Sequence, residues 1–451
     1  MRILFFTHSL GRTRHFRGVV NGLAARGHRV ILATTGRDDA QKAGKGPYAH
    51  PGIDIVTCPD ARSDRWAAAA DTVRAVRDRA RYFDPRYAAA AKLAGRAAAH
   101  TPKAWNRAFE RHAWLRRHWK TTQRVLAAAE RLIPCDPGFL RFLRDQAPDV
   151  VLVTPLVDFE TYQADYVKCA VALGIPVVYP PFSWDNLTNR GVIRVLPDRV
   201  LVWNRHQRAE AIDLHGVPPE RIVITGAPRF DAFFSMRPST TREEFCAAAG
   251  LDPDRPVVLY MCSSSFIAPY EVAFVREWIA ALRGAAAGSW PRDCNVLIRP
   301  HPANHEQWET ADLSDLPGVA VWTQKLTLQA DQRLYDSLFH AEAAVGLNTS
   351  AMIEAAIVGR PVFTIRTSEF AGGQAGTLHF HYLLAENGGV VTVADSLDEH
   401  RRQLETAPAA ADIAERSRRF LGDFVRPRGL DLEAAPIMVE EIERAAALRR
   451  R

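Results

Sequence analysis

The stretch GLNTSAMIEAAIVGRPVFTI, residues 346–365, holds the end of one strand, a complete helix and the start of the next strand. The polar residues at 348–350 are typical of a helix N-terminus, where they cap the helix and leave backbone N–H groups available to an anion. The helix should end at Gly359, which permits a left-handed conformation, because Pro361 prevents its continuation. This order of elements predicts a parallel α/β sheet.

The same alternation of apolar runs and helical patterns extends along the whole chain. Strands are predicted in the first half within residues 2–7, 29–35, 53–57, 149–155, 175–180, 198–204 and 220–226. Further strands are predicted in the second half within residues 255–265, 295–302, 318–322, 341–348, 361–366 and 388–393. We therefore expect an α/β protein with two Rossmann-like domains facing a cleft. In such sheets ligands bind outside the carboxyl ends of the strands.

The domain boundaries follow from this pattern. We expect an N-terminal Rossmann-like domain over 1–230, with an Arg/Ala-rich helical insertion at about 62–145. A C-terminal Rossmann-like domain is expected over 231–406. A helical tail over 407–451 is expected to pack back on the N-terminal domain.

Composition excludes several classes of protein. The chain has 451 residues, 47% of them hydrophobic, which is typical of a folded globular protein. Its six cysteines show no metal-binding spacing, so neither a disulfide framework nor a zinc site is expected, and a reducing cytosol fits. No signal peptide and no run of ~18 apolar residues is present. We expect a cytoplasmic location, with contact at the inner face of the membrane through the segment described next.

The positive charge is concentrated in one segment. Residues 62–131 contain 17 Lys and Arg against 6 Asp and Glu, a balance of +11, whereas the net charge of the chain is +7. Four tryptophans accompany these charges. The segment is interpreted either as an insertion with solvated arginine faces or as a docking surface for an anionic acceptor or a membrane. Nucleic acid is not expected as a partner, because no nucleic-acid motif is present.

Glu354 does not fit a structural role in its helix. A capping box places the acid three residues after the cap, and the residue three before Glu354 is Ala351, which cannot cap. A carboxylate one turn inside the helix could instead accept hydrogen bonds from a ribose diol while the helix N-terminus holds a diphosphate.

The pattern of a strand, small polar residues, and a helix carrying Glu-Ala-x-x-x-Gly-x-Pro resembles the nucleotide-sugar site of GT-B glycosyltransferases. It is also similar to their relatives, the non-hydrolysing UDP-GlcNAc 2-epimerases and the CDP-glycerol glycerophosphotransferases. RIVITGAPRFDAF (221–233) looks like the inter-domain element of these families, and RPHP (299–302) resembles a motif that contacts CMP- or CDP-linked donors in some members. The resemblance implies that loop N–H groups hold the diphosphate and that Glu354 binds the ribose.

The resemblance and the positions at strand ends together give the candidate donor-binding residues. Glu369 and Gln374 match acid and amide side chains that hold the donor's sugar hydroxyls in these families. The full set is Ser263, Ser264, Ser265, Arg299, His301, Asn348, Thr349, Ser350, Glu354, Glu369 and Gln374.

The first half should supply the general base and the acceptor contacts. Many inverting members carry a catalytic histidine after the first strand, which makes His15 and His8 candidates. The candidate bases are Asp185 and His15, ranked equal, followed by His8 and Asp158. The candidate acceptor residues are Arg12, Trp184 and Asn186.

These observations predict a metal-independent glycosyltransferase that moves a sugar from a nucleotide-sugar donor to a glycan or lipid-linked acceptor. The resemblance places such an enzyme in bacterial envelope polysaccharide synthesis. No Asp-x-Asp motif follows a predicted strand, and no cofactor besides the donor substrate is expected. Three alternatives remain open: a UDP-GlcNAc 2-epimerase-like enzyme, a CDP-glycerol or CMP-Kdo type transferase, and a non-catalytic GT-B binding subunit.

Overall fold

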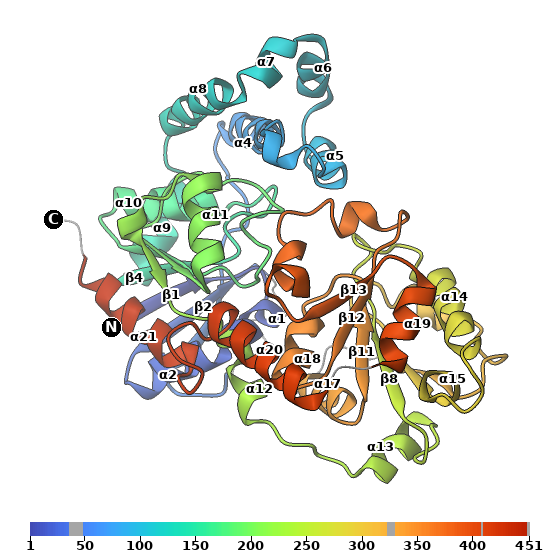
Figure 1. Cartoon of the computed structure of the whole chain (residues 1–451). Helices are drawn as coiled ribbons and strands as arrows, with labels where there is room; N and C mark the ends of the chain where they lie inside the picture. Colours follow the sequence, from blue (N-terminus) through green and yellow to red (C-terminus); the bar gives the residue numbers. More distant parts are fainter. Residues whose placement is uncertain (36–47, 323–329, 407–408, 449–451) are drawn as a thin grey trace. The chain divides into compact units, whose positions relative to one another are not determined.

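The computed structural model describes residues 1–35, 48–322, 330–406 and 409–448, and Figure 1 shows its ribbon. The chain divides into two compact units. One comprises Met1–Asp231 with Gly422–Arg451, and the other comprises Ala232–Leu421. Each unit contains a parallel sheet, and every one of the apolar runs predicted as a strand contains one in the described residues. The predicted α/β fold is therefore confirmed.

The sheet of the first unit has seven strands in the order β3-β2-β1-β4-β5-β6-β7. Their bounds are β1 Arg2–Phe6, β2 Arg29–Thr34, β3 Ile53–Thr57, β4 Val150–Val153, β5 Val177–Tyr179, β6 Arg199–Val202 and β7 Ile222–Ile224. Parallel strands covered by helices on both faces are apolar on both faces. In β1, Leu4 and Phe6 accordingly enter one apolar layer, and Ile3 and Phe5 enter the other.

Helices cover both faces of this sheet. The layer that receives Leu4 contains α9 (Pro137–Gln146), α10 (Gln163–Ala172) and α11 (Arg205–His215). The opposite layer contains α2 (Arg17–Ala25) and α21 (Ala434–Ala446).

The C-terminal helix α21 packs closely on α2 because two glycines of α2 face it. A Cβ atom added at Gly18 would lie 3.1 Å from Cβ of Ala435, and one added at Gly22 would lie 3.3 Å from Cγ2 of Val439. The tail that was predicted as one element from residue 407 is divided between the units. Helix α20 (Ala410–Phe424) belongs to the second unit as far as Leu421, and the chain from Gly422 onward belongs to the first.

The sheet of the second unit has six strands in the order β10-β9-β8-β11-β12-β13. Their bounds are β8 Val257–Met261, β9 Asn295–Arg299, β10 Val319–Val321, β11 Ala343–Gly346, β12 Val362–Ile365 and β13 Val391–Ala394. The helices that follow these strands include α14 (Glu271–Arg283), α17 (Ala330–Phe339), α18 (Ala351–Ile357) and α19 (Leu397–Glu405). The segment between β7 and β8 carries short helices, of which α13 (Arg242–Ala249) begins with a capping box between Thr241 and Glu244.

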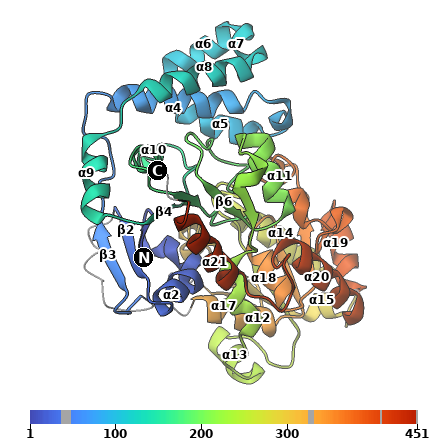
Figure 2. The ribbon, with the colours of Figure 1, turned by 90° about the vertical axis from the view of Figure 1, so that its left-hand side faces the viewer.

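The predicted insertion is a group of helices between β3 and β4. It comprises α4 (Ala67–Arg81), α5 (Ala91–Ala99), α6 (Lys103–Arg111), α7 (Ala113–Arg117) and α8 (Trp119–Leu132). Figures 1 and 2 show α6, α7 and α8 on the side of α4 that faces away from the sheet.

The arginines of this insertion have two environments. Those of α4 are buried: Arg74 contacts Asp165 at 2.7 Å and Glu130 at 3.0 Å, and Arg77 pairs with the same Glu130. The Lys and Arg side chains of α6 to α8 are exposed. The expectation of solvated arginine faces is therefore wrong for α4, where buried carboxylates neutralise Arg74 and Arg77, and correct for the outer helices.

Candidate functional site

The strand order of each sheet defines where a ligand should bind. In open parallel sheets that place is the carboxyl edge where the strand order reverses. In the second unit the chain runs from β8 to β9 and β10 on one side and then crosses to β11 on the other, so the order reverses between β8 and β11. In the first unit the order reverses between β1 and β4 by the same reasoning.

At the reversal point of the second unit, hydrogen bonds join three loops. The Ser263 hydroxyl, after β8, accepts the backbone N–H of Asn348, after β11, at 3.3 Å. The Asn348 side chain donates to the carbonyl of Gly373, after β12, at 2.7 Å. Two predicted donor-binding residues thus act together as the framework of this edge. Both are buried, so they position the loops on which the more exposed Ser264 and Ser265 are carried.

A buried acid that the sequence analysis missed holds the loop after β8. Glu271, the first residue of α14, accepts the backbone N–H of Ser263 at 2.9 Å and the hydroxyl of Tyr260 at 3.1 Å. Burial raises the pKa of Glu271 to about 8, although the two hydrogen bonds act in the opposite direction. Nothing in the sequence around Glu271 indicated this role, because its partner is a backbone group.

The helix of the opening stretch forms as predicted. Helix α18 begins after Ser350, whose side chain makes no capping hydrogen bond, and Gly359 follows its end in the left-handed region at φ 77°. Thr349 and Ser350 are half-buried, whereas Glu354 is 1% exposed within the helix. Glu354 lies four residues after Ser350, one position beyond that of the acid in a capping box. Its contact with a ribose remains a prediction.

The other predicted donor-binding residues lie in different surroundings. Arg299 donates to the carbonyl of Arg333 at 3.0 Å and to the hydroxyl of Ser337 at 2.8 Å, so its guanidinium is bound to α17. The His301 ring accepts the N–H of Ala303 at 3.1 Å. These bonds connect Arg299 to helix α17 and His301 to the backbone of Ala303. None of these three bonds joins the RPHP motif to the loops after β8 and β11.

Glu369 and Gln374 lie on the loop after β12 but differ in exposure. Glu369 is exposed. Gln374 is 1% exposed, and its amide donates to the carbonyls of Leu347 at 3.1 Å and Ile365 at 2.9 Å. The amide of Gln374 therefore joins two strand ends, which is a structural role, whereas Glu369 is open to solvent.

At the reversal point of the first unit, charged side chains gather around Asp158. Arg12, after β1, donates to this carboxylate at 2.8 Å, and Arg190, after β5, pairs with it at 2.7 Å. The Nε2 atom of His8 lies 3.8 Å from the same carboxylate. The loop of Asp158 includes Leu156 (φ 45°) and Glu160 (φ 57°), whose left-handed backbone is unfavourable for residues other than glycine.

The two candidate histidines differ in their hydrogen bonds. The Arg229 guanidinium lies 2.7 Å from Nδ1 of His15. Because arginine can only donate, this Nδ1 accepts and the proton lies on Nε2, which leaves His15 no free lone pair for a base. Burial and the neighbouring Arg229 lower the pKa of His15 well below its usual value. Burial and Arg12 also lower the pKa of His8, so its ring is neutral near pH 7 and can accept a proton.

The loop after β5, with sequence SWDNLTNRG, is largely structural. Asn186 is fully buried, and its side-chain oxygen accepts the backbone N–H groups of Phe182 and Ser183. Trp184 is 4% exposed. Asp185 is half-buried and accepts from the Asn189 amide. Of the three predicted residues on this loop, only Asp185 is accessible enough to contact a ligand directly in this structure.

The insertion holds this loop through its backbone. Arg81 donates to the carbonyls of Arg190, at 3.0 Å, and Gly191, at 2.6 Å. Tyr82 donates to the Arg190 carbonyl at 2.8 Å. Arg190 in turn contacts Asp158, so the insertion positions a residue of the first unit's candidate site. Arg190 follows closely after Trp184, Asp185 and Asn186, which were predicted as site residues, but it was not itself predicted.

Comparison with known proteins gives likeness in structure alone. No protein-family model matches the chain, and no curated protein matches it. A glycosyltransferase from Rickettsia africae ESF-5 superposes with a TM-score of 0.56 at 9% identity, covering 98% of both chains. The UDP-GlcNAc 2-epimerase from Methanocaldococcus jannaschii superposes with a TM-score of 0.54 at 11% identity, covering 98% of this chain and 100% of that chain.

A third similar structure contains UDP-glucose. Anabaena Alr3699/HepE in complex with UDP-glucose superposes with a TM-score of 0.53 at 9% identity, covering 99% of both chains. At these identities the likeness concerns the fold, which is the GT-B fold, as the sequence resemblance implied. Among the described residues, no helix is both long and apolar enough to cross a membrane.

Proposed function

We propose that this protein is a glycosyltransferase that takes a nucleotide-sugar donor and a glycan or lipid-linked acceptor. The observation that carries the proposal is the hydrogen-bonded edge of the second unit, where Ser263, Asn348 and Gly373 bring three strand-end loops together at the point of strand-order reversal. A GT-B structure of similar fold binds UDP-glucose. We infer that this chain binds a ligand of the same class, a nucleotide-sugar.

The donor would be held mainly by backbone and hydroxyl groups. Ser264 and Ser265 are accessible on the loop after β8, and Thr349 and Ser350 are accessible at the start of α18. Such groups suit a diphosphate, because N–H and O–H donors stabilise its charge as the bond to the sugar breaks. In this arrangement Glu354 would bind the ribose, and Glu369 is the exposed side chain suited to the sugar hydroxyls.

The general base in the proposal is His8. Its neutral ring lies beside the carboxylate of Asp158, which is itself fixed by Arg12 and Arg190. A positioned base of this kind removes the proton of an acceptor hydroxyl. His15, which the sequence ranked first with Asp185, is less suitable because its Nδ1 accepts from Arg229.

A second candidate function is a sugar-nucleotide 2-epimerase, which needs acids in the first unit. One observation favours it: Asp158 and Asp185 lie on the loops that follow β4 and β5, which are neighbouring strands of the first sheet. Incubating the protein with a nucleotide-sugar and no acceptor separates the two functions. An epimerase forms a new sugar nucleotide, whereas a transferase leaves the donor unchanged or slowly hydrolysed.

A thermal-shift screen with UDP, CDP, CMP, GDP and dTDP tests the proposal directly. A ligand present at a hundredfold excess over its Kd raises the apparent stability by ~2.7 kcal/mol. We expect one of the nucleotides to give such a shift, and a preference for CMP or CDP would favour the CDP-glycerol or CMP-Kdo type of transferase. If none stabilises the protein, the donor site proposed here is wrong and the non-catalytic alternative gains.

We also propose that the outer helices of the insertion contact an anionic membrane surface. Helices α6 to α8 expose eight Lys or Arg side chains against one glutamate. Trp114, Val125 and Leu132 are 59%, 63% and 84% exposed on the same helices. Basic residues with exposed apolar side chains are typical of interfacial helices. Flotation with anionic liposomes at low salt, where screening is weakest, tests the contact. If the protein does not float with the liposomes, these helices are a solvated insertion without a membrane contact.

A further inference from the structure

A run of backbone carbonyls in the loop after β5 accepts hydrogen bonds from side chains of the insertion. The acceptors are the carbonyls of Leu187, Thr188, Asn189, Arg190 and Gly191. Arg81, the last residue of α4, binds three of them, including the Arg190 carbonyl at 3.0 Å. Tyr82 adds a bond to the same Arg190 carbonyl at 2.8 Å, and Tyr87 and Arg96 bind the remaining two. The insertion thus fixes the path of the backbone over the whole of 187–191.

Helix α4 also holds the amide groups that follow this run. Asp78 accepts the N–H of Val192 at 3.0 Å and pairs with the Arg194 guanidinium. Gly191 lies so close to the Asp78 carboxylate that an added Cβ atom would stand 2.6 Å from its Oδ1 atom, a contact that only glycine avoids. The loop after β5 therefore lies directly on α4, and a shift of one would move the other.

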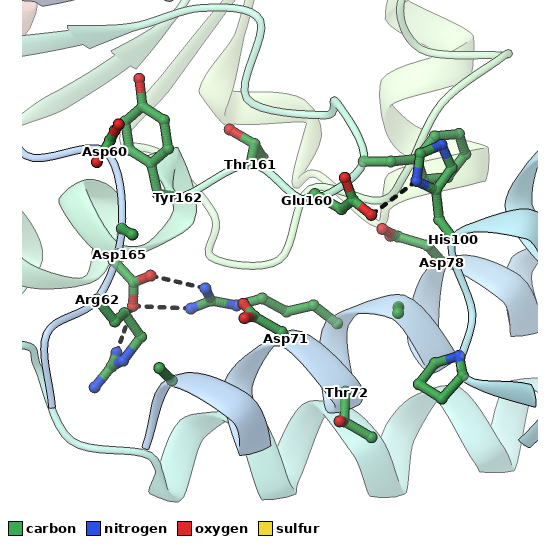
Figure 3. Close-up of a pocket in the computed structure, with 16 residues that line it drawn as sticks. Asp60, Arg62, Asp71, Thr72, Asp78, His100, Glu160, Thr161, Tyr162 and Asp165 are labelled. Atoms are coloured by element: carbon green, nitrogen blue, oxygen red, sulfur yellow. Dashed lines mark hydrogen bonds and ion pairs between the residues drawn. The ribbon is translucent and has the colours of Figure 1, made fainter. Parts of the chain in front are cut away.

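The loop after β4, which carries Asp158, contacts α4 less directly. A cavity of about 340 Å³ lies between α4 and residues 160–162 of this loop (Figure 3). Figure 3 also shows the ion pair between Glu160 and His100, at 2.9 Å, in which both side chains are partly open to solvent. An exposed pair of this kind contributes little. The carboxylate of Asp158 itself is bound by Arg12 and Arg190, so the insertion reaches it through Arg190.

The position of Arg190 matters for His8 because both side chains face Asp158. The two oxygens of Asp158 pair with different guanidiniums, Arg12 at 2.8 Å and Arg190 at 2.7 Å, and Nε2 of His8 lies 3.8 Å from the carboxylate. The other ring nitrogen of His8 lies 3.5 Å from the Tyr162 hydroxyl. Burial lowers the pKa of His8, the two guanidiniums lower it further, and the Asp158 carboxylate acts in the opposite direction. The balance leaves the His8 ring neutral because both carboxylate oxygens are already bound by arginine.

We propose that Arg81 is a positioning residue of the first unit's site. By fixing the backbone at residue 190, it keeps the Arg190 guanidinium on Asp158, and this leaves His8 able to take a proton from an acceptor hydroxyl. If Arg190 moved away, the freed carboxylate oxygen would pair with the His8 ring and hold a proton there. The role of His8 as the base rests on the proposed function, whereas the placement of Arg190 rests on the contacts of the insertion alone.

NMR titration of the histidine rings in the full-length protein tests this inference. The His8 signal is assigned by its loss in His8→Gln. Arg190→Gln removes a guanidinium and frees one oxygen of Asp158, and both effects favour the protonated ring. We therefore expect the pKa of His8 to rise in Arg190→Gln. In an activity assay, the acidic limb of kcat/KM should move to higher pH in the same variant.

Three variants of the insertion then test whether its bonds position Arg190. Arg81→Lys keeps the charge but loses the planar group that spans several carbonyls, and Tyr82→Phe loses only the hydroxyl bound to the Arg190 carbonyl. Both should raise the pKa of His8 by less than Arg190→Gln does. Tyr87→Phe is the matched control, because it removes the same kind of bond from Thr188 and should leave His8 unchanged. Tyr82→Phe decides the question if the buried Arg81→Lys does not fold.

Three results would overturn the inference. An unchanged pKa of His8 in Arg190→Gln would mean that Arg190 does not act on the base. A rise in Arg190→Gln without any rise in the Arg81 and Tyr82 variants, or an equal rise in Tyr87→Phe, would mean that the bonds to the Arg190 carbonyl do not position its side chain.

The titration needs neither donor nor acceptor, so it is independent of the proposed function. The expected shifts without any stabilisation by a nucleotide would leave the positioning role of Arg81 standing and refute the transferase. Stabilisation by a nucleotide without these shifts would leave the transferase standing and refute the positioning role.

Discussion

Replacing Glu271 by glutamine tests how the loop after β8 is held in place. The carboxyl of Glu271 is fully buried and accepts the N–H of Ser263 and the hydroxyl of Tyr260. Glutamine has nearly the same shape and keeps one acceptor oxygen, but it cannot titrate. The substitution therefore changes the pH dependence of stability more than the packing of the loop.

The magnitude follows from the raised pKa. In the unfolded chain the carboxyl loses its proton near pH 4.5, whereas the folded protein retains it up to about pH 8. Between these values only the folded state holds the proton, so the free energy of unfolding falls as the pH rises. From pH 5.5 to 7.5 the linkage relation gives a loss of about 2.5 kcal/mol for the wild type. In Glu271→Gln this residue no longer titrates, so the free energy of unfolding does not fall in this way. The stability of the variant relative to the wild type therefore increases by about 2.5 kcal/mol from pH 5.5 to 7.5.

Hydrogen exchange of peptides from β8 and α14, measured over a urea titration at the two pH values, reports the unfolding of this unit. Glu277→Gln, an exposed acid on the same helix, is the matched control and should follow the wild type. A Glu271→Gln protein whose stability changes with pH as the wild type does would refute the reasoning. It would mean that Glu271 ionises in the folded protein as it does in water.

Three further predictions concern single side chains. Burial lowers the pKa of His400 to about 3, so the unfolded state binds a proton that the folded state does not, and this residue alone contributes a loss of about 1.4 kcal/mol of stability from pH 7.5 to 5.5, opposite in sign to the contribution of Glu271. His400→Phe should remove this contribution, so its stability relative to the wild type should rise by that amount over the same interval in denaturant titrations, and an unchanged difference would contradict the assignment. Glu354→Ala should weaken nucleotide binding by ~1.5–3 kcal/mol in calorimetry, as the loss of a charge-assisted hydrogen bond would, and unchanged affinity would remove Glu354 from the site. His8→Gln should lower kcat by ~10²–10⁴, while His15→Gln should stay within about tenfold of the wild type. Wild-type kcat/KM should fall as the pH drops through the lowered pKa of His8, because the protonated ring cannot accept a proton. A larger effect of His15→Gln than of His8→Gln would favour His15, which the sequence ranked higher.

The strands could be predicted because each is a short apolar run between polar turns. The residues at the ligand-binding edge could be predicted because they come directly after a strand in the sequence. Ser263 and Asn348 were identified in this way, and both contribute to the candidate site. Glu271 could not be identified, because its partner is a backbone N–H brought close only by the fold. Arg299 was expected at the ligand edge, yet its guanidinium binds α17, since strand position does not determine the direction of a long side chain.

The arginines of α4 illustrate a second limit of sequence reasoning. Arg74, Arg77 and Arg81 recur at helical spacing, as they would on a solvated face, and local charge gives no indication that the face is buried. Asp165 and Glu130, the partners of Arg74 and Arg77, lie far away along the chain, and Arg81 binds the backbone carbonyl of Gly191. The net charge of the segment was therefore a poor guide to the surroundings of its arginines.

The buried ion pairs of the insertion also constrain how this protein could be shortened or have arisen. Asp165 belongs to α10 of the Rossmann-like body, yet both of its guanidinium partners come from residues 62–74. Arg194, in the loop that follows β5, is likewise matched by Asp78 of α4. Deleting α4 would remove Asp78 from Arg194 and leave Asp165 with Arg62 alone, and removing one partner of a buried ion pair costs ~3–5 kcal/mol. The insertion and the body are thus thermodynamically interdependent, and a minimal two-domain version would require Asp165 and Arg194 to be replaced by apolar residues in the same step.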